Sequence, residues 1–391
     1  MASSPSPLRT AFAGLIAMAS VMGIGRFAYT PILPDMAEAV ALSESQAGAI
    51  AAANFLGYLF GSLAAGSRFL KGNRRTWTLL MLALSAATTG AMAITTSIPA
   101  YLLIRFIGGG CSALVMVFGS AIVLDRLTLM GRPNLTHIHF AGVGTGMAIS
   151  AIIVAGLGTL SIGWTSQWLA SALASLIALF VVIFMLPSGH GDNAPPIAGT
   201  RTKYDRRMIP LSLSYGLFGF GYVITATFIS ALVRQTPSIA AIEPVIWLIV
   251  GLSAIPSVAV WVWVGRRLGN PTSMALACVL EAAGVAATVL FDSTAAVLMG
   301  GALLGGTFMG ITALGMTTAR ELAIREDGGD PRRMLGLIVA AFGTGQMIGP
   351  AYGGYIANIT GGYTVPSLTA SFALVLAAGL ALLVKVDRSS A

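Results

Sequence analysis

The sequence predicts an all-α membrane protein whose twelve transmembrane helices form two pseudo-symmetric six-helix bundles. Three observations predict this fold class. The chain is 56% hydrophobic and only 9% charged, it contains twelve long apolar stretches, and its two halves repeat one another. A soluble globular chain carries about 25% charged residues. A chain of 391 residues with so little charge therefore indicates a polytopic membrane protein.

The apolar stretches define the predicted helices in order along the chain. Each stretch is close to the ~20 residues that a helix needs to cross ~30 Å of hydrocarbon. The predicted spans are 10–34, 45–66, 76–96, 100–124, 138–160, 164–186, 209–233, 244–264, 272–291, 295–319, 333–358 and 364–385.

The basic residues predict how these helices are oriented. Nineteen of the 22 Lys and Arg residues lie in polar segments that alternate along the chain, and the exceptions are Arg26, Arg105 and Arg234. The opposite gaps hold acidic residues, with Arg234 as their only base. Because Lys and Arg accumulate on the cytoplasmic side, we expect both termini in the cytoplasm. The same bias explains the net charge of +8, so we expect no nucleic-acid partner.

The longest polar gap divides the chain into two halves. It covers 187–208, is rich in Pro, Gly and Asp, and has the composition of a flexible linker. We therefore expect an N-terminal bundle over 1–186, a cytoplasmic linker over 187–208 and a C-terminal bundle over 209–391. Residues 144–149 of the fifth span match residues 343–348 of the eleventh. Such a duplication predicts a central site between the halves.

Arg26, Arg105 and Glu281 are the charged residues predicted to lie inside the membrane. Intramembrane charges are costly, so they usually face a cavity or a partner. Arg26 lies about 16 residues, or ~24 Å, from the inner end of its span, and Arg105 lies about 5 residues below the outer end of its own. If their two helices line one cavity, these arginines at similar depth would make an anion site, because their forked donors match a carboxylate or a phosphate.

Neutral polar residues are expected to complete this site, because several of them share helix faces or equivalent depths with Arg26. The predicted substrate-binding residues are Arg26, Arg105, Tyr29, Thr30, Asn54, Tyr58, Tyr222, Thr225 and Gln346. Three alternatives remain open. In the first, Arg105 does not bind the anion but extends to the outer headgroups. In the second, Arg26 binds backbone carbonyls of a broken helix. In the third, the neutral residues only form interhelical hydrogen bonds.

Further charged residues suggest roles in coupling and gating. Glu281 lies near the middle of its span and is the predicted proton-coupling residue, the alternative being a carboxyl that is simply protonated and hydrogen-bonded to a neighbour. Asp125 and Glu321, at the inner ends of the fourth and tenth spans, are predicted to gate by pairing with basic residues such as Arg68 or Arg74.

No catalytic or metal site is expected. His137 and His139 lie on different helix faces, and Cys111 and Cys278 are not in a paired or metal-ligand spacing. The sequence contains no nucleotide-binding loop, zinc signature or nucleophile–base constellation. We therefore expect no enzyme, no ATP-driven pump, no metal and no cofactor.

The chain resembles the major facilitator superfamily over nearly its whole length. Residues 102–109, Leu-Leu-Ile-Arg-Phe-Ile-Gly-Gly, look like the arginine motif of its fourth helix. Residues 23–31, 54–58 and 218–222 resemble its YbfB/YjiJ-like group. The resemblance implies the major facilitator fold in a bacterial inner membrane, and a link between Arg105 and proton movement or substrate charge.

Two departures from the superfamily pattern limit the resemblance. The segment before the basic run at 68–75 lacks the usual Asp, which weakens the usual closure of the cytoplasmic side. The antiporter-type glycine pattern lies in the eleventh span, at 345–354, whereas the fifth span has Ser150 and Ala151 in its place. The direction of transport therefore does not follow from the motif.

These features together predict a monomeric secondary active transporter that works by alternating access among membrane lipids. We expect its substrate to be a small organic anion and its coupling ion to be a proton. One alternative is a proton-linked exporter of drugs or metabolites in which the arginines serve gating. A second is a membrane sensor or scaffold without net flux.

Overall fold

The computed structural model describes residues 6–67, 70, 72–187, 206–325 and 331–384. All regular elements in this part of the chain are helical, and twelve stretches are long and apolar enough to cross a membrane. The predicted all-α fold with twelve spans is confirmed. The predicted linker at 187–208 lies almost wholly outside the described residues.

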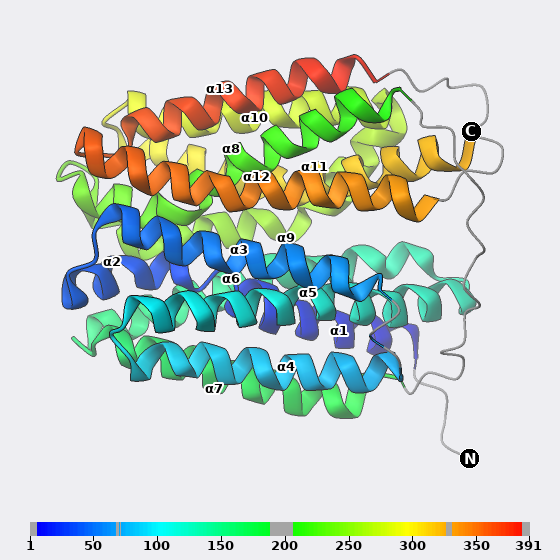
Figure 1. The fold of residues 1–391 in the computed structure, drawn as a ribbon, viewed down its shortest axis with the longest axis horizontal. Helices are drawn as coiled ribbons and strands as arrows, with labels where there is room; N and C mark the ends of the chain where they lie inside the picture. Colours follow the sequence, from blue (N-terminus) through cyan, green and yellow to red (C-terminus); the bar gives the residue numbers. More distant parts are fainter. Residues whose placement is uncertain (1–5, 68–69, 71, 188–205, 326–330, 385–391) are drawn as a thin grey trace.

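The elements in chain order are α1 (Pro7–Met18), the π-helical segment η1 (Ala19–Ile24), α2 (Tyr29–Val40), α3 (Glu44–Ala65), α4 (Arg74–Ala91), the 3₁₀ turn η2 (Met92–Ile94), α5 (Ile98–Leu129), η3 (Pro133–Leu135), α6 (Thr136–Thr159), α7 (Trp164–Met185), α8 (Met208–Gln235), η4 (Ala240–Ile242), α9 (Glu243–Leu268), α10 (Asn270–Leu290), α11 (Thr294–Arg325), α12 (Pro331–Thr360) and α13 (Thr364–Leu382). Helix α1 begins and α13 ends at the same end of the molecule, on the right of Figure 1. We refer to this end as the terminal end and to the opposite one as the distal end.

The first span is the least regular, because α1 and α2 are separated by η1 and a turn. Within this segment the N–H of Gly25 donates to the carbonyl of Ser20 at 2.8 Å, and Phe27 donates to Met22 at 3.2 Å. These wider i to i−5 hydrogen bonds define a π-bulge, which often marks a functional position in a helix. The span predicted at 10–34 is present as one stretch, Pro7–Val40, whose α-helix is interrupted by η1 and the turn.

The most extensive packing between the first six spans and the last six, among the described residues, involves three helix pairs. Helix α3 packs along α12, α6 along α9, and α2 along α8. Glycines permit the closest approaches: a Cβ on Gly144 would lie 2.6 Å from the carbonyl oxygen of Gly251, and one on Gly48 would lie 2.3 Å from that of Pro350. Any larger residue at Gly48 or Gly144 would force the paired helices apart.

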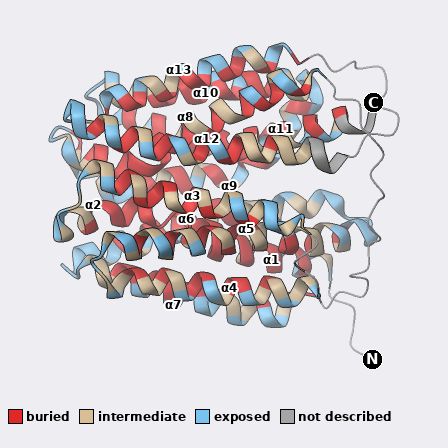
Figure 2. Ribbon diagram, in the orientation of Figure 1, coloured by how far each residue is buried: buried red, intermediate tan, exposed pale blue. Residues whose placement is uncertain are grey.

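Burial shows which helices form the centre. In the most apolar 18-residue segment of the first span, 83% of the residues are buried, and the same holds for the seventh span. The corresponding share in the sixth span is 28%. Figure 2 shows the exposed residues on the outward faces of the helices and at their ends. The broken first span and α8 therefore lie in the interior, where residues of both halves meet.

Candidate functional site

Arg105 supports the broken first span. Its guanidinium, reaching over from α5, donates to the carbonyl of Gly25 at 3.1 Å and to that of Arg26 at 2.9 Å. Its Cζ atom lies 5.1 Å from the centroid of the Tyr29 ring. The side chain is buried, so it does not extend to the headgroups. Of the two arginines, it is Arg105 that binds carbonyls of the broken helix, a role that the sequence analysis considered for Arg26.

Arg26 is held by aromatic rings. Its Cζ atom lies 4.3 Å from the ring centroid of Tyr58, 4.5 Å from that of Phe55 and 5.5 Å from that of Phe27. The residue is only 3% exposed, and its Nε and Nη2 atoms have no hydrogen-bond partner among the described residues. These two nitrogens form one edge of the guanidinium, which is the geometry that receives a carboxylate in a bidentate manner.

Three of the predicted neutral residues of the first half donate hydrogen bonds to backbone carbonyls around the arginines. Asn54 donates to the carbonyl of Arg105 at 2.9 Å, and Tyr29 donates to that of Ala47 at 2.9 Å. Thr30 crosses to the other half and donates to the carbonyl of Ala226 at 2.6 Å. These contacts position the helices around Arg26. Their role in substrate binding stays a prediction.

The second half contributes stacked rings and one amide. Tyr222 lies nearly parallel to Phe308, at 5.6 Å between ring centroids, and to Phe342, at 6.1 Å. Phe308 meets Phe27 edge-on at 6.1 Å, across the boundary between the halves. The amide of Gln346 donates to the Tyr222 hydroxyl, and its Oε1 atom has no partner in the described part of the chain.

Phe308 and Phe342 are not predicted site residues, and Phe27 belongs only to the motif at residues 23–31. At sequence level an aromatic residue in an apolar helix looks the same whether it faces a site or fills the core. The position of Phe27 directly after Arg26 was the one available signal. Thr225, predicted from the pseudo-symmetry, is buried in α8, and its hydroxyl has no partner among the described residues.

Glu281 is fully buried in α10. Its Oε2 atom accepts a hydrogen bond of 2.9 Å from the Thr307 hydroxyl, while Oε1 has no partner in the part of the chain that is described. The same hydroxyl lies 2.7 Å from the carbonyl of Leu303. Thr307 can therefore donate to Leu303 while it accepts from a protonated Glu281, or donate to Glu281 when that carboxyl is ionised.

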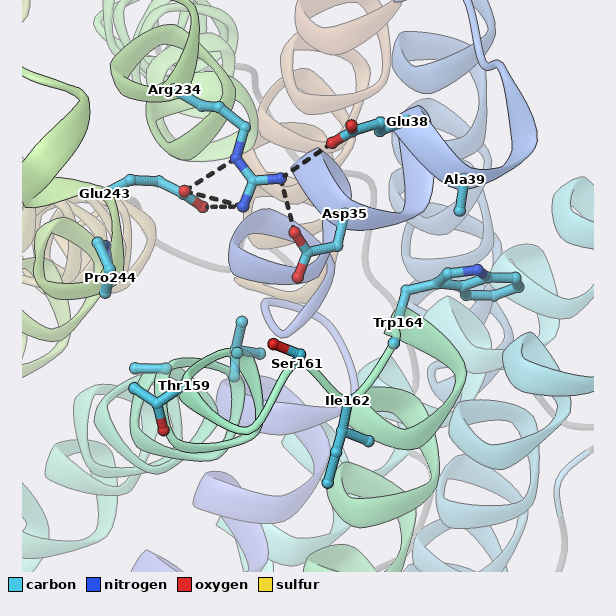
Figure 3. A pocket seen from close by; sticks show the side chains of 14 residues that line it. Asp35, Glu38, Ala39, Thr159, Ser161, Ile162, Trp164, Arg234, Glu243 and Pro244 are labelled. Carbon is cyan, nitrogen blue, oxygen red and sulfur yellow. Dashed lines mark hydrogen bonds and ion pairs between the residues drawn. The ribbon is translucent and has the colours of Figure 1, made fainter.

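A cluster of charged residues at the distal end is centred on Arg234 (Figure 3). Its Nε and Nη2 atoms donate to the two carboxylate oxygens of Glu243 at 2.8 and 2.9 Å, and its Nη1 atom lies 2.6 Å from Asp35. Glu38 is 3.9 Å away, and Gln167 donates to Asp35 at 2.5 Å. The cluster lines a cavity of about 680 Å³ and ties α2 to the hairpin of α8 and α9.

A second distal contact lies at the start of α3. Glu44 accepts a hydrogen bond of 2.7 Å from Gln235 and a further one from the Tyr363 hydroxyl. Burial raises the pKa of Tyr363, so its phenol stays protonated and keeps donating. Together with the Arg234 cluster, this contact joins acids of the first half to donors of the second. The sequence showed Arg234 as a lone base among acids, but it could not show which acids it meets.

The residues predicted to gate lie near the terminal end. Asp125 pairs with Arg74 at 3.3 Å, and the side chain of Asp125 is 68% exposed whereas that of Arg74 is 32% exposed. Glu321 accepts a hydrogen bond of 2.8 Å from Asn270. Arg68 lies outside the described residues. The gating role of these three residues stays a prediction.

The described residues contain no group of three His, Cys, Asp or Glu side chains arranged to hold a metal ion. A nitrogen of the buried His139 ring lies 2.9 Å from the Ser120 hydroxyl. Cys111 and Cys278 are free and buried in separate helices.

Comparison with known families identifies the class of protein. The model of the family described as "Uncharacterised MFS-type transporter YbfB" matches residues 18–382. The chain belongs to this family. It is accordingly a multi-pass membrane transporter of the major facilitator superfamily and not an enzyme, as the sequence motifs predicted.

Two curated relatives match shorter segments. The 4-hydroxybenzoate transporter PcaK of Acinetobacter baylyi is 27% identical over 189 residues, which are 48% of this chain and 41% of the relative. The MFS-type transporter YbcL of Bacillus subtilis is 29% identical over 125 residues, 30% of this chain and 32% of the relative. The matched segments thus span less than half of either relative.

Solved structures show the same fold over the whole chain. The crystal structure of the nucleoside transporter NupG superposes with a TM-score of 0.70 at 16% identity, covering 97% of this chain and 99% of that one. The structure of a point mutant of NupG gives 0.68 at 13% identity, covering 95% and 97%. At this level of identity the likeness concerns the fold alone.

Proposed function

We propose that the protein moves a small organic anion across a bacterial inner membrane by alternating access, with a proton as the coupling ion. The observation that carries this proposal is the buried edge of Arg26, whose Nε and Nη2 atoms have no protein partner within the described residues. An unpaired buried charge is costly. A carboxylate would satisfy both nitrogens at once.

The position of Arg26 supports a role in transport. It lies beside Phe27, which contacts the opposite half, and it belongs to the broken first span. The 4-hydroxybenzoate transporter PcaK carries the name of an organic anion, and it supports this substrate class through its similarity to part of the chain. Both features favour an anion held between the two halves.

Alternating access requires that one end opens while the other closes. In the proposed orientation both termini are cytoplasmic, so the distal end faces outward. There the Arg234 cluster and the Glu44 contacts join the first half, 1–186, to the second, 209–391. Arg26 is buried, so a solute reaches it only after the halves move. We infer that the distal contacts break in the outward-open state and re-form after the solute is bound.

Glu281 supports proton coupling. Thr307, its hydrogen-bond partner, directly precedes Phe308, the ring that meets Phe27 across the interface. A change in the protonation of Glu281 redirects the Thr307 hydroxyl between the carboxylate and the carbonyl of Leu303. This rearrangement acts on the turn of α11 that carries Phe308, and so links the proton to the site of the solute.

The experiment is flux through proteoliposomes that contain the purified protein. A panel of small carboxylates, screened first by thermal shift, should include at least one that exchanges across the bilayer and accumulates under an imposed pH gradient. Flux of apolar cations without flux of carboxylates would support a drug exporter. Binding without any flux would support a sensor. Either result would contradict the proposal.

A further inference from the structure

We propose that the solute held by Arg26 is a planar aromatic carboxylate, and that the surface formed by Phe27, Phe308 and Tyr222 selects its ring. This inference rests on the anion-binding role proposed for Arg26 and adds the chemistry of the rest of the solute. It is carried by a continuous series of aromatic rings that begins at the guanidinium and extends into the opposite half.

On the first half, the rings determine how a ligand can approach. The Cζ atom of Arg26 lies over the rings of Phe55 and Tyr58, at 4.5 and 4.3 Å from their centroids. The edge formed by Nε and Nη2, which lack protein partners among the described residues, is where a carboxylate would bind. Phe27, 5.5 Å from Cζ, stands beside the guanidinium, so the body of a bound acid would lie against aromatic surface.

On the second half, the rings offer a surface for stacking. The ring planes of Phe308 and Tyr222 differ by only 12°, and those of Tyr222 and Phe342 by 7°. Phe308 presents itself edge-on to Phe27, with 76° between the planes. Offset-stacked and edge-to-face arrangements are the favoured geometries of aromatic pairs. A flat ring inserted between the halves can adopt both, whereas a saturated ring of equal size cannot.

The polar atoms beyond the rings suit a substituted ring. Gln346 and Tyr222 share one hydrogen bond, and the amide retains one polar atom that has no partner in the described chain. This holds for either orientation of the amide, because turning it exchanges the bonded and unbonded atoms. This atom would be the partner, on the second half, for a hydrogen-bonding substituent on the aromatic ring of the solute.

A purely structural role for the rings predicts something different. Rings that only fill the interior would not distinguish a bound aromatic acid from an aliphatic one. The two roles therefore separate in a comparison of ligands with equal charge and similar size.

The test measures dissociation constants of the purified full-length protein for benzoate, cyclohexanecarboxylate, hexanoate and benzyl alcohol by calorimetry. We expect benzoate to bind about threefold to tenfold more tightly than cyclohexanecarboxylate, the range that corresponds to one aromatic pair. The variant Phe308→Leu should reduce this ratio to near one. The matched control Phe372→Leu, on the exposed face of α13, should leave the ratio unchanged.

The outcomes separate this inference from the proposed function. Equal binding of benzoate and cyclohexanecarboxylate by the unmodified protein, abolished in Arg26→Gln, would overturn the ring preference and leave the anion site standing. Binding of benzyl alcohol as tight as that of benzoate would overturn both, and so would no binding of any carboxylate. The ratio in the unmodified protein decides the question even if Phe308→Leu does not fold.

Discussion

The distal cluster around Arg234 and the central site around Arg26 use the same chemical group in opposite ways. At the distal end, the Nε–Nη2 edge of Arg234 is filled by the carboxylate of Glu243, and Asp35 binds the remaining nitrogen. In the centre, the same edge of Arg26 has no protein partner in the described part of the chain. The Arg234 side chain is 33% exposed, whereas Arg26 is 3% exposed.

The guanidinium without a partner is the buried one, although the free-energy cost of an unpaired charge is larger in the interior than at the surface. Solvent weakens that cost at the distal end, and burial raises it in the centre. The chain nevertheless places its acids around Arg234 and aromatic rings around Arg26. A guanidinium paired with protein acids holds protein elements together, while one whose edge has no protein partner suits a ligand. We therefore assign closure to the distal cluster and solute binding to the central site.

The largest effect is expected at Arg26. In Arg26→Gln, two charge-assisted hydrogen bonds to the solute are lost, each worth about 1.5–3 kcal/mol, so transport in proteoliposomes should fall at least about 100-fold. Removal of an unpaired buried charge offsets the loss of the contacts with the aromatic rings, so the melting temperature should change little. Arg267→Gln, which removes an arginine that lies over Trp263, is the matched control and should transport normally. Wild-type flux in Arg26→Gln would refute the assignment.

The next effect separates coupling from binding. Glu281→Gln keeps a hydrogen-bonding group beside Thr307 but cannot carry a proton. Exchange of solute across the bilayer should persist, while accumulation driven by a pH gradient should fall about tenfold or more. Asp292→Asn, in an exposed loop, is the control. A Glu281→Gln protein that still concentrates its solute under the gradient would exclude this residue as the proton carrier.

Arg105 should behave differently from Arg26, although both arginines lie in the centre. Arg105→Gln removes the donors to the carbonyls of Gly25 and Arg26. Leaving such buried groups unsatisfied costs about 1–3 kcal/mol each, so the melting temperature should fall by about 3–6 °C. Thermal unfolding in detergent measures this. An unchanged melting temperature would show that Arg105 does not support the broken helix.

The smallest effect is expected at the distal cluster. Because its side chains are partly exposed, Arg234→Gln should shift the population toward the outward-open state by about twofold to fivefold. The measurement is the rate of thiol labelling at Ala231→Cys, a buried position in a cavity beside Arg234, since the two native cysteines are buried. An unchanged labelling rate would show that the Arg234 cluster does not stabilise the closed distal end.

Sequence patterns predicted those features of the fold and of the site that depend on hydrophobic periodicity and on the positions of charged residues. The twelve spans follow from hydrophobicity, and the shared depth of Arg26 and Arg105 follows from counting residues along two helices. The contact between Arg105 and the Arg26 carbonyl agrees with that depth. Each of these features depends on residues that are close together in the chain, and so it can be predicted from the sequence.

The sequence did not show that Arg105 binds the carbonyls of the broken helix while the Nε–Nη2 edge of Arg26 has no protein partner among the described residues. This difference between the two arginines depends on the turn at residues 25–28, between η1 and α2, where Arg105 binds the carbonyls of Gly25 and Arg26. The ring surface was also hidden, because Phe308 and Tyr222 become neighbours only when α8 and α11 pack. Both features arise from tertiary contacts between segments that are far apart in the sequence.

The most direct test of the central claim is a cycle that pairs a change in the ligand with a change in Arg26. Dissociation constants would be measured for benzoate and its uncharged analogue benzamide, with the unmodified protein and with Arg26→Gln. We expect the unmodified protein to prefer benzoate by at least about 100-fold and Arg26→Gln to show almost no preference. The same preference for benzoate in both proteins would mean that the carboxylate is not bound by Arg26.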